Sequence, residues 1–159
     1  MLLPPSEKLE FSTVALADFE ELVELRIAAM RESLERVGRF DPARARERLR
    51  KTFYPEHTRF IVYGGKKIGF YTFRPAEDCL QLDHLYVHPD HQSKGVGSSV
   101  AKKLAAEADA LRRPIRVGAL RNSASNRFYQ RHGFAKERED EWDIYYIRQP
   151  ATPSGNGRP

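Results

Sequence analysis

The stretch His91–Val100, HQSKGVGSSV, joins a predicted buried strand to a predicted amphipathic helix. Its two glycines, Gly95 and Gly97, are separated by a single residue. Glycines in a tight loop let the backbone approach another group closely. The first turn of a helix offers unpaired N–H groups and the positive end of the helix dipole. An anion site, such as one for a phosphate, is therefore physically reasonable here. The two glycines by themselves, however, favour a glycine-rich turn that merely starts a helix.

Predicted strands and helices lie on both sides of this stretch. The most apolar strand, CLQLDHLYV at residues 79–87, comes directly before it. Alternating apolar residues predict further strands at residues 9–14, 58–63, 67–73, 115–120, from 134 onward and at 142–147. Helical spacing predicts helices at residues 19–38, 42–53, after Gly95 to about 111, and 123–133.

Capping and turn residues support these boundaries. Asp18 with Glu21 three residues later predicts a capping box at the start of the first helix. Asp41-Pro42 predicts the start of the second helix, and Gly64-Gly65 predicts a two-residue hairpin turn. The order of the elements predicts a single α/β domain whose central sheet is mixed and mostly antiparallel, flanked by helices. Parallel pairing is expected only where the helix after Gly95 crosses over.

The composition limits the function. With a formal net charge of +5, 40% hydrophobic and 31% charged residues, the chain resembles an ordinary soluble protein that attracts anions. Nucleic acid is not the expected partner, because the basic residues alternate with glutamate on helices, as in RARERLRK. We expect neither a membrane span nor a signal peptide. Cys79 is the only cysteine, which fits a cytoplasmic protein.

Other phosphate and metal motifs fit less well. A P-loop needs lysine and serine or threonine after its second glycine, and Ser98-Ser99 stand there. The dinucleotide fingerprint needs a third glycine where Val100 stands. Three histidines occur at positions 84, 88 and 91, but no cysteine or paired carboxylate completes a metal site, and no metal is expected.

Two motifs together carry a family resemblance. The region LDHLYVHPDHQSKGVG resembles the acetyl-CoA signature of the GNAT superfamily of N-acetyltransferases, with Gln92–Gly97 as Gln/Arg-x-x-Gly-x-Gly/Ala behind Leu85–Val87 as Leu-x-Val. The region NSASNRFYQRHGF is similar to the family's Asn-x-x-Ala-x-x-x-Tyr-x-x-x-Gly-Phe, with Ser125 in place of alanine. The resemblance implies a GNAT-like domain over residues 8–148, which leaves residues 1–7 as an N-terminal extension. The composition of the last residues predicts a disordered tail at residues 149–159.

The resemblance also implies how acetyl-CoA, the co-substrate, is held. The backbone N–H groups of residues 92–97 would bind its pyrophosphate, and the main chain of Leu85 and Val87 would pair with the pantetheine arm. Asn122 and Asn126 would orient that arm from the other side. The full predicted cofactor set is Leu85, Tyr86, Val87, Gln92, Ser93, Lys94, Gly95, Val96, Gly97, Ser98, Asn122, Asn126 and Tyr129.

Acetyl transfer to an amine needs a base, an oxyanion donor and an acid for the leaving thiolate. The resemblance implies Tyr129 as the acid and a strand N–H near Leu85 or Tyr86 as the oxyanion donor. The alternative for Tyr129 is a core aromatic residue that packs beside Phe134. Asp83, acting through water, is the first candidate for the base. His84 is the second, and the alternative for His84 is a buried histidine that is hydrogen-bonded in the core.

The acceptor stays open among small amines, amino-acid-like amines, peptide N-termini and protein lysines. The resemblance places its site near the first two helices, the loop at residues 51–57 and the last strands. The candidate residues are Arg26, Met30, Tyr54 and Tyr145, with Arg31, Ser33 and Tyr146 beside them. The two arginines are expected either to hold an acceptor's anionic group or to be solvated helix charges. A non-catalytic acyl-CoA-binding module is the alternative function, and a homodimer through the outer strands is plausible.

Overall fold

The structure is a computed structural model, and it describes residues 8–151. The predicted N-terminal extension at residues 1–7 lies outside the described residues. The same holds for all of the predicted tail beyond Ala151. The described chain divides into two compact units, which we call unit 1 and unit 2. Unit 1 comprises the chain up to Phe73 together with Asp83–Gly97, and unit 2 comprises Arg74–Leu82 and the chain from Ser98.

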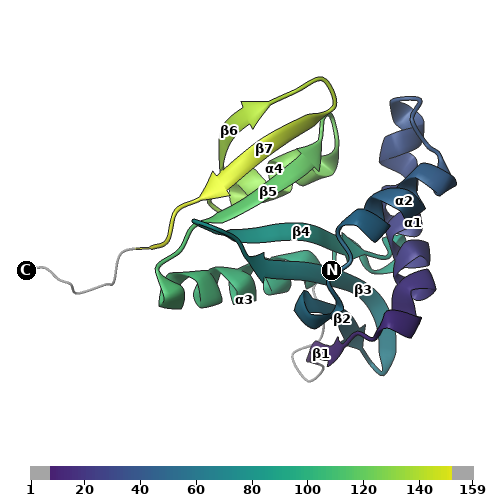
Figure 1. Cartoon of the computed structure of the whole chain (residues 1–159), viewed down its shortest axis with the longest axis horizontal. Coiled ribbons are helices and arrows are strands. Elements are labelled where there is room, and N and C mark those ends of the chain that lie inside the picture. Colours follow the sequence, from purple (N-terminus) through teal and green to yellow (C-terminus); the bar gives the residue numbers. More distant parts are fainter. Residues whose placement is uncertain (1–7, 152–159) are drawn as a thin grey trace, which may run out of the picture. The chain divides into compact units, whose positions relative to one another are not determined.

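Unit 1 combines two helices with the first strands of the chain (Figure 1). Its elements are β1 (Glu10–Thr13), α1 (Phe19–Arg36), α2 (Pro42–Lys51), β2 (Thr58–Tyr63), most of β3 (Lys66–Pro75) and the second half of β4 (Leu80–Val87). The pairs β1–β2 and β2–β3 are antiparallel. Gly64 and Gly65 both have positive φ, at 58° and 77°, which is the backbone that the predicted two-residue hairpin turn requires.

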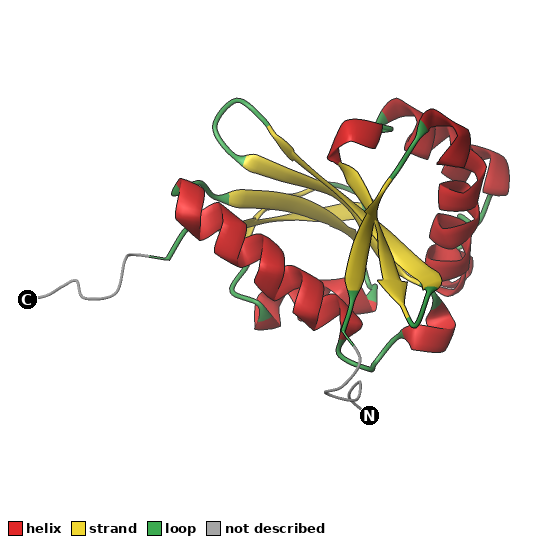
Figure 2. Ribbon diagram, turned by 90° about the horizontal axis from the view of Figure 1, so that it is seen from below, coloured by secondary structure: helices red, strands yellow, loops and turns green. Residues whose placement is uncertain are grey.

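Unit 2 holds the start of β4 and the second part of the chain. Its other elements are most of α3 (Val96–Leu111), β5 (Ile115–Leu120), α4 (Ala124–Arg131), β6 (Ala135–Glu139) and β7 (Asp143–Arg148). Strands β4 and β5 are parallel, as predicted for the crossover through α3, whereas β7 is antiparallel to both β5 and β6. Figure 2 shows helices flanking the strands in each unit.

Hydrogen bonds connect the strands in the order β1-β2-β3-β4-β5-β7-β6, which makes a mixed and mostly antiparallel seven-stranded sheet. The predicted α/β fold class is therefore confirmed. No helix of the described residues is long and apolar enough to cross a membrane.

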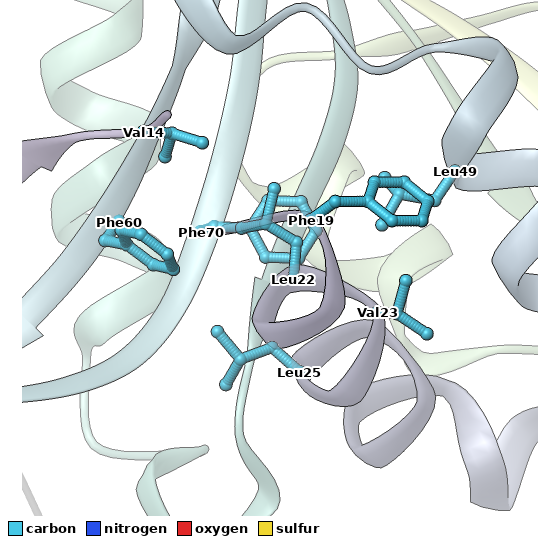
Figure 3. Packing of buried hydrophobic residues seen from close by; sticks show 8 residues of the cluster. All are labelled: Val14, Phe19, Leu22, Val23, Leu25, Leu49, Phe60 and Phe70. Atoms are coloured by element: carbon cyan, nitrogen blue, oxygen red, sulfur yellow. The ribbon is translucent and has the colours of Figure 1, made fainter. Parts of the chain in front are cut away.

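The core of unit 1 forms where α1 and α2 cover the strands (Figure 3). Leu22 and Phe70 are completely shielded from solvent, and Leu49 and Phe60 are each 1% exposed. Leu22 and Leu25 of α1 are buried, as its apolar spacing predicts, whereas Ile27 and Met30 farther along the helix are half-buried. Phe19 adds an aromatic contact with Phe53, at 5.1 Å between ring centroids.

Two helix starts differ in how well the sequence predicted them. Asp41 caps α2 as expected, since its carboxylate accepts hydrogen bonds from the backbone N–H groups of Ala43 and Arg44 at 3.0 and 3.3 Å. The capping box at Asp18 is wrong. Its carboxylate accepts from the Ala15 N–H at 2.8 Å instead, because a turn of 3-10 helix at Leu16–Asp18 precedes α1.

Candidate functional site

The loop between β4 and α3 has the backbone of an anion site. After a short 3-10 helix at Pro89–His91, Ser93 and Gly95 both adopt left-handed conformations, with φ of 63° and 88°. Helix α3 begins at the next residue, Val96, and Gly97 lies in its first turn. Left-handed residues of this kind turn successive N–H groups toward a common point, and the helix N-terminus adds further donors. The backbone of this loop is suited to bind a phosphate, and phosphate binding by the loop stays a prediction.

Side chains and charges around this loop favour an anion as well. Burial and then the positive charges of Lys94 and Lys66 lower the pKa of His91, with His88 adding to the effect and Asp90 opposing it. The Nδ1 atom of His91 is the one buried side-chain nitrogen or oxygen of the described residues that lacks a hydrogen-bond partner. The surroundings of the loop are thus positively charged, which favours an anion.

Gln92 anchors the loop to the end of β4. Its side-chain amide donates to the carbonyl of Val87 at 2.7 Å, and the N–H of His88 donates to the carbonyl of Ile68 on β3 at 2.7 Å. The motif glutamine therefore has a role that the sequence pattern did not reveal, which is to fix where the loop leaves the strand. The predicted pairing of Leu85 and Val87 with a pantetheine arm stays a prediction.

Strand β4 separates the two candidate bases onto opposite faces. Its side chains alternate: Leu82 and His84 are buried, whereas Asp83 and Leu85, which point to the other face, are half-buried. Gly69 on β3 lies so close to β4 that an added Cβ would stand 2.1 Å from the carbonyl oxygen of Tyr86. The backbones of β3 and β4 therefore approach each other closely here, which glycine at position 69 permits.

His84 belongs to a hydrogen-bonded network in the interior of unit 1. Its Nε2 lies 2.7 Å from the hydroxyl of Thr52, just after α2, and its Nδ1 lies 3.3 Å from the hydroxyl of Tyr86. Burial and then the charge of Arg26 lower the pKa of His84 to about 3. This arrangement matches the buried, hydrogen-bonded histidine that the sequence left as the alternative, and so low a pKa makes His84 a poor proton acceptor.

Arg26 joins the same network. Its Nη1 donates to the carbonyl of Ala45 on α2 at 2.9 Å, and its Nε donates to the Tyr86 hydroxyl at 3.3 Å. Arg26 is only 6% exposed, so the expectation of a solvated helix charge is wrong for this residue. That expectation does describe Arg31, which is exposed and pairs with Glu35 at 3.0 Å. The sequence missed the part played by Thr52, whose only signal is its place after an amphipathic helix.

Met30 on α1 and Tyr54 after α2 are further acceptor candidates of unit 1, and both are half-buried. The backbone carbonyl of Tyr54 accepts a hydrogen bond from the hydroxyl of Thr58 at 2.7 Å, which holds the loop between α2 and β2.

In unit 2, Asn126 is committed to the protein itself. Its Oδ1 accepts from the hydroxyl of Tyr146 at 2.8 Å, and its Nδ2 donates to the carbonyls of Leu120 and Ser123 at 2.9 and 3.0 Å. Asn126 therefore ties the start of α4 to the end of β5 and to the side chain of Tyr146 on β7. Asn122 precedes it in a left-handed conformation, with φ of 67°.

Tyr129 lies within an aromatic cluster of unit 2. It is 5% exposed, and its ring centroid lies 5.2 Å from those of Phe128 and Phe134 and 6.3 Å from that of Tyr146. Its packing alone is that of a core aromatic residue. Ser98, at the start of the unit 2 part of α3, lies 3.0 Å from Nε2 of His132, just after α4.

Tyr145 is held differently from its neighbour on β7. Its hydroxyl donates to Asp140 at 2.9 Å, and the guanidinium of Arg138 stands 3.8 Å from its ring centroid. Burial and the bond to Asp140 raise the pKa of Tyr145. Within the residues described, no group of three or more histidine, cysteine or acidic side chains is arranged to hold a metal ion.

Comparisons with known proteins agree with the fold. The family model described as an acetyltransferase (GNAT) domain matches residues 56–136. The PaiA N-acetyltransferase of Thermoplasma acidophilum, solved in complex with coenzyme A, has 16% identity and a TM-score of 0.72, covering 89% of this chain and 99% of that chain. An acetyltransferase from Thermus thermophilus has 18% identity and a TM-score of 0.71, covering 89% of this chain and 97% of that chain.

A third similar structure is the ribosomal-protein-S18-alanine N-acetyltransferase of Escherichia coli, with 15% identity and a TM-score of 0.66. The similarity covers 95% of this chain and 99% of that chain. No curated protein matches the chain. At these identities the similarity to the solved structures establishes the fold alone. The match to the family model carries more weight, because it spans half of the chain.

Proposed function

Because the chain belongs to the GNAT acetyltransferase family, we propose that it transfers an acetyl group from acetyl-CoA directly to the nitrogen of an amine acceptor. The observation that carries this proposal is the loop between β4 and α3. Two left-handed residues lead into a helix N-terminus there, beside the positive charges of Lys94 and Lys66. A pyrophosphate is the part of acetyl-CoA that such a loop binds best.

In this proposal, different residues bind different parts of acetyl-CoA. The N–H groups of residues 92–97 hold the pyrophosphate, and the side chain of Gln92 fixes the loop rather than contacting the cofactor. The main chain of Leu85 and Val87 pairs with the pantetheine arm, as one strand pairs with another. The amide of Asn126 is used within unit 2, so we assign it the positioning of α4 instead of a direct contact.

The chemistry then follows from direct transfer. The neutral amine attacks the thioester carbonyl, a C–N bond forms, the C–S bond breaks, and CoA leaves as a thiolate. A backbone N–H near Leu85 or Tyr86 stabilises the oxyanion. Tyr129 gives its proton to the thiolate, and the proton lost by the amine passes through water to Asp83. His84 is set aside as the base, because its pKa is lowered to about 3.

The first test is thermal unfolding with and without acetyl-CoA, beside NADH and ATP as controls. At about a hundredfold excess over the dissociation constant, binding adds about 2.7 kcal/mol to the free energy of unfolding. For a chain of this length that is a rise of about 5–10 °C in Tm. A rise with acetyl-CoA alone supports the proposal, and a rise only with NADH or ATP contradicts it.

The second test separates an enzyme from a binding module. Release of free CoA thiol is measured on adding amines to the wild type and to Tyr129→Phe. We expect the variant to bind acetyl-CoA normally and to release thiol at least about tenfold more slowly. Tyr71→Phe, a buried tyrosine of unit 1 without a proposed role, serves as the control. A wild-type protein that binds acetyl-CoA and releases no thiol with any amine would be a non-catalytic module.

A further inference from the structure

We infer that the amine acceptor carries a carboxylate and that Arg26 binds this carboxylate. The inference rests on the proposed function and adds the chemical class of the acceptor. Arg26 projects from α1 into the interior of unit 1, where it meets the backbone of α2 and the side chain of Tyr86. What distinguishes it is a buried positive charge that no acidic group of the described residues neutralises.

Buried arginines normally pair with a carboxylate, since moving a charge out of water is costly. Arg26 is 6% exposed, yet its partners are all neutral: the carbonyl of Ala45, the hydroxyl of Tyr86 and the face of the Tyr86 ring at 5.7 Å. None of the ion pairs formed by the described residues includes Arg26. Arg26 is therefore a buried cation that no carboxylate of the described residues pairs with.

The hydrogen bonds of the network are consistent with a neutral His84. When Thr52 donates its hydroxyl proton to the carbonyl of Arg48 at 3.2 Å, it can accept from Nε2 of His84 at 2.7 Å. Nδ1 of His84 then accepts from the hydroxyl of Tyr86, whose oxygen accepts from Nε of Arg26. His84 is neutral in this chain of bonds, and it leaves the charge of Arg26 uncompensated.

One side of the guanidinium stays available to a ligand. Nε and Nη1 are used by Tyr86 and Ala45, whereas Nη2 makes no hydrogen bond with the described residues. Nη2 is not among the buried and unpartnered side-chain atoms of the described residues either. A guanidinium that is anchored on two nitrogens and open at the third is preorganised for an external oxygen ligand.

The charge favours a carboxylate over a phosphate. The network holds a single positive charge, because His84 is neutral and Thr52 and Tyr86 carry none. A carboxylate balances that charge, whereas a phosphate monoester brings close to two negative charges at neutral pH. The acceptor expected from this site is an amino acid or another small amine with a carboxylate near the amino group.

The experiment compares matched acceptors with and without the carboxylate. A panel of α-amino acids, the same amino acids as C-terminal amides, and phosphoethanolamine are tested by thiol release. We expect the wild type to prefer the carboxylates by about tenfold or more in kcat/KM, which is the effect of one charge-assisted contact. Equal use of amides, or a preference for phosphoethanolamine, would overturn the inference.

Variants show whether Arg26 makes the distinction. Arg26→Gln should lose about tenfold or more with the carboxylates and change little with the amides, while the KM for acetyl-CoA stays constant. Arg26→Lys keeps the positive charge without the planar guanidinium. Its kcat/KM with the carboxylates should fall between those of the wild type and Arg26→Gln. Arg31→Gln, on the same helix and exposed, should behave as the wild type. An equal loss of both acceptor classes in Arg26→Gln would mean a purely structural role and would overturn the inference.

A binding measurement covers acceptors that the panel does not contain. The CoA-loaded protein is heated with N-acetylglycinate or N-acetylglycinamide at equal ionic strength. Stabilisation by the carboxylate alone, lost in Arg26→Gln, supports the inference, whereas no stabilisation together with no turnover of any carboxylate rejects it. Failure of acetyl-CoA itself to stabilise the protein would instead reject the proposed function.

Discussion

Gly95 shows how a single backbone angle makes the phosphate loop possible. Its φ of 88° lies in the left-handed region, where a side chain is strained and glycine is not. Ser93, with φ of 63°, adopts a similar conformation despite its side chain. Strain of about 1–2 kcal/mol at a non-glycine residue is a feature typical of sites that bind ligands.

We predict that Gly95→Ala weakens acetyl-CoA binding by at least about tenfold, because the new Cβ distorts the loop that gathers the N–H groups. Isothermal titration calorimetry measures the affinity. Gly38→Ala is the matched control, since Gly38 also has positive φ, at 73°, and no atom lies within 4 Å of its added Cβ. Both variants lose stability to similar strain, and only Gly95→Ala should lose affinity. Equal affinities would contradict the assignment of the loop.

His84 is the second residue whose surroundings determine its behaviour. Burial and the charge of Arg26 lower its pKa from 6.5 to about 3. Between these values the unfolded chain binds a proton that the folded protein does not. The free energy of unfolding therefore falls as the pH drops below about 6.5, by about 1.4 kcal/mol per pH unit, and this loss levels off near pH 3.

We predict that lowering the pH from about 6.5 to about 5 costs the wild type about 2 kcal/mol through His84. Urea unfolding at the two pH values measures the difference. His84→Gln has a lower stability at neutral pH and should lack this part of the pH slope. His57→Gln changes a half-buried histidine outside the network and should keep the slope. Identical slopes in wild type and His84→Gln would contradict the buried, neutral histidine.

Among the elements, β4 brings together most of the groups of unit 1 that we assign to function. It carries Asp83 on one face and His84 on the other, and the phosphate loop follows its end. Gly69 on β3 lies close to the β4 backbone at Tyr86, beside the proposed oxyanion donor. Contacts to α1 and α2 then hold the Tyr86 side chain through Arg26 and His84.

We predict that Gly69→Ala lowers the free energy of unfolding by about 3 kcal/mol or more, because its Cβ would meet the carbonyl oxygen of Tyr86, which cannot move aside cheaply. Gly118→Ala on β5 is the matched control. Its Cβ would stand 3.1 Å from the ring of Tyr145, a half-buried side chain that can shift. Chemical unfolding compares the two. Similar losses would show that β4 tolerates displacement at Tyr86.

For the whole molecule, the formal net charge of +5 and the sequence pI of about 9.4 favour anionic ligands. Acetyl-CoA carries its negative charges on phosphates, and the electropositive loop at His91–Gly97 meets them in our proposal. The same charge does not require nucleic acid, because many basic side chains form ion pairs, such as Arg116 with Asp78 and Glu137.

We predict that raising sodium chloride from about 50 mM to about 500 mM weakens acetyl-CoA binding by several-fold, since salt screens the attraction between charges. Fluorescence or calorimetric titration measures the dissociation constant. Sucrose at the same osmolality serves as the control and should leave the affinity unchanged. A dissociation constant that is independent of salt would mean that apolar contacts dominate binding.

The sequence alone determined the order of the elements, because their signals are local. Helical spacing, Asp41-Pro42 and Gly64-Gly65 act within a few residues, and the structure has each element where these signals predicted it. The same is true of the two motifs that identified the family. The capping box at Asp18 was wrong, because a turn of 3-10 helix at Leu16–Asp18 precedes α1. The Asp18 carboxylate accepts from the N–H of Ala15 in that turn instead.

Only the tertiary structure decided the state of the side chains. In the sequence, Arg26 is one of many charged residues on helices. It is buried because Ala45 on α2 and Tyr86, both far from it in the sequence, accept its hydrogen bonds. His84 has an ordinary histidine's chemistry until burial lowers its pKa to about 3. Burial, partners and charge balance depend on residues far apart in the sequence, which is why no local pattern could supply them.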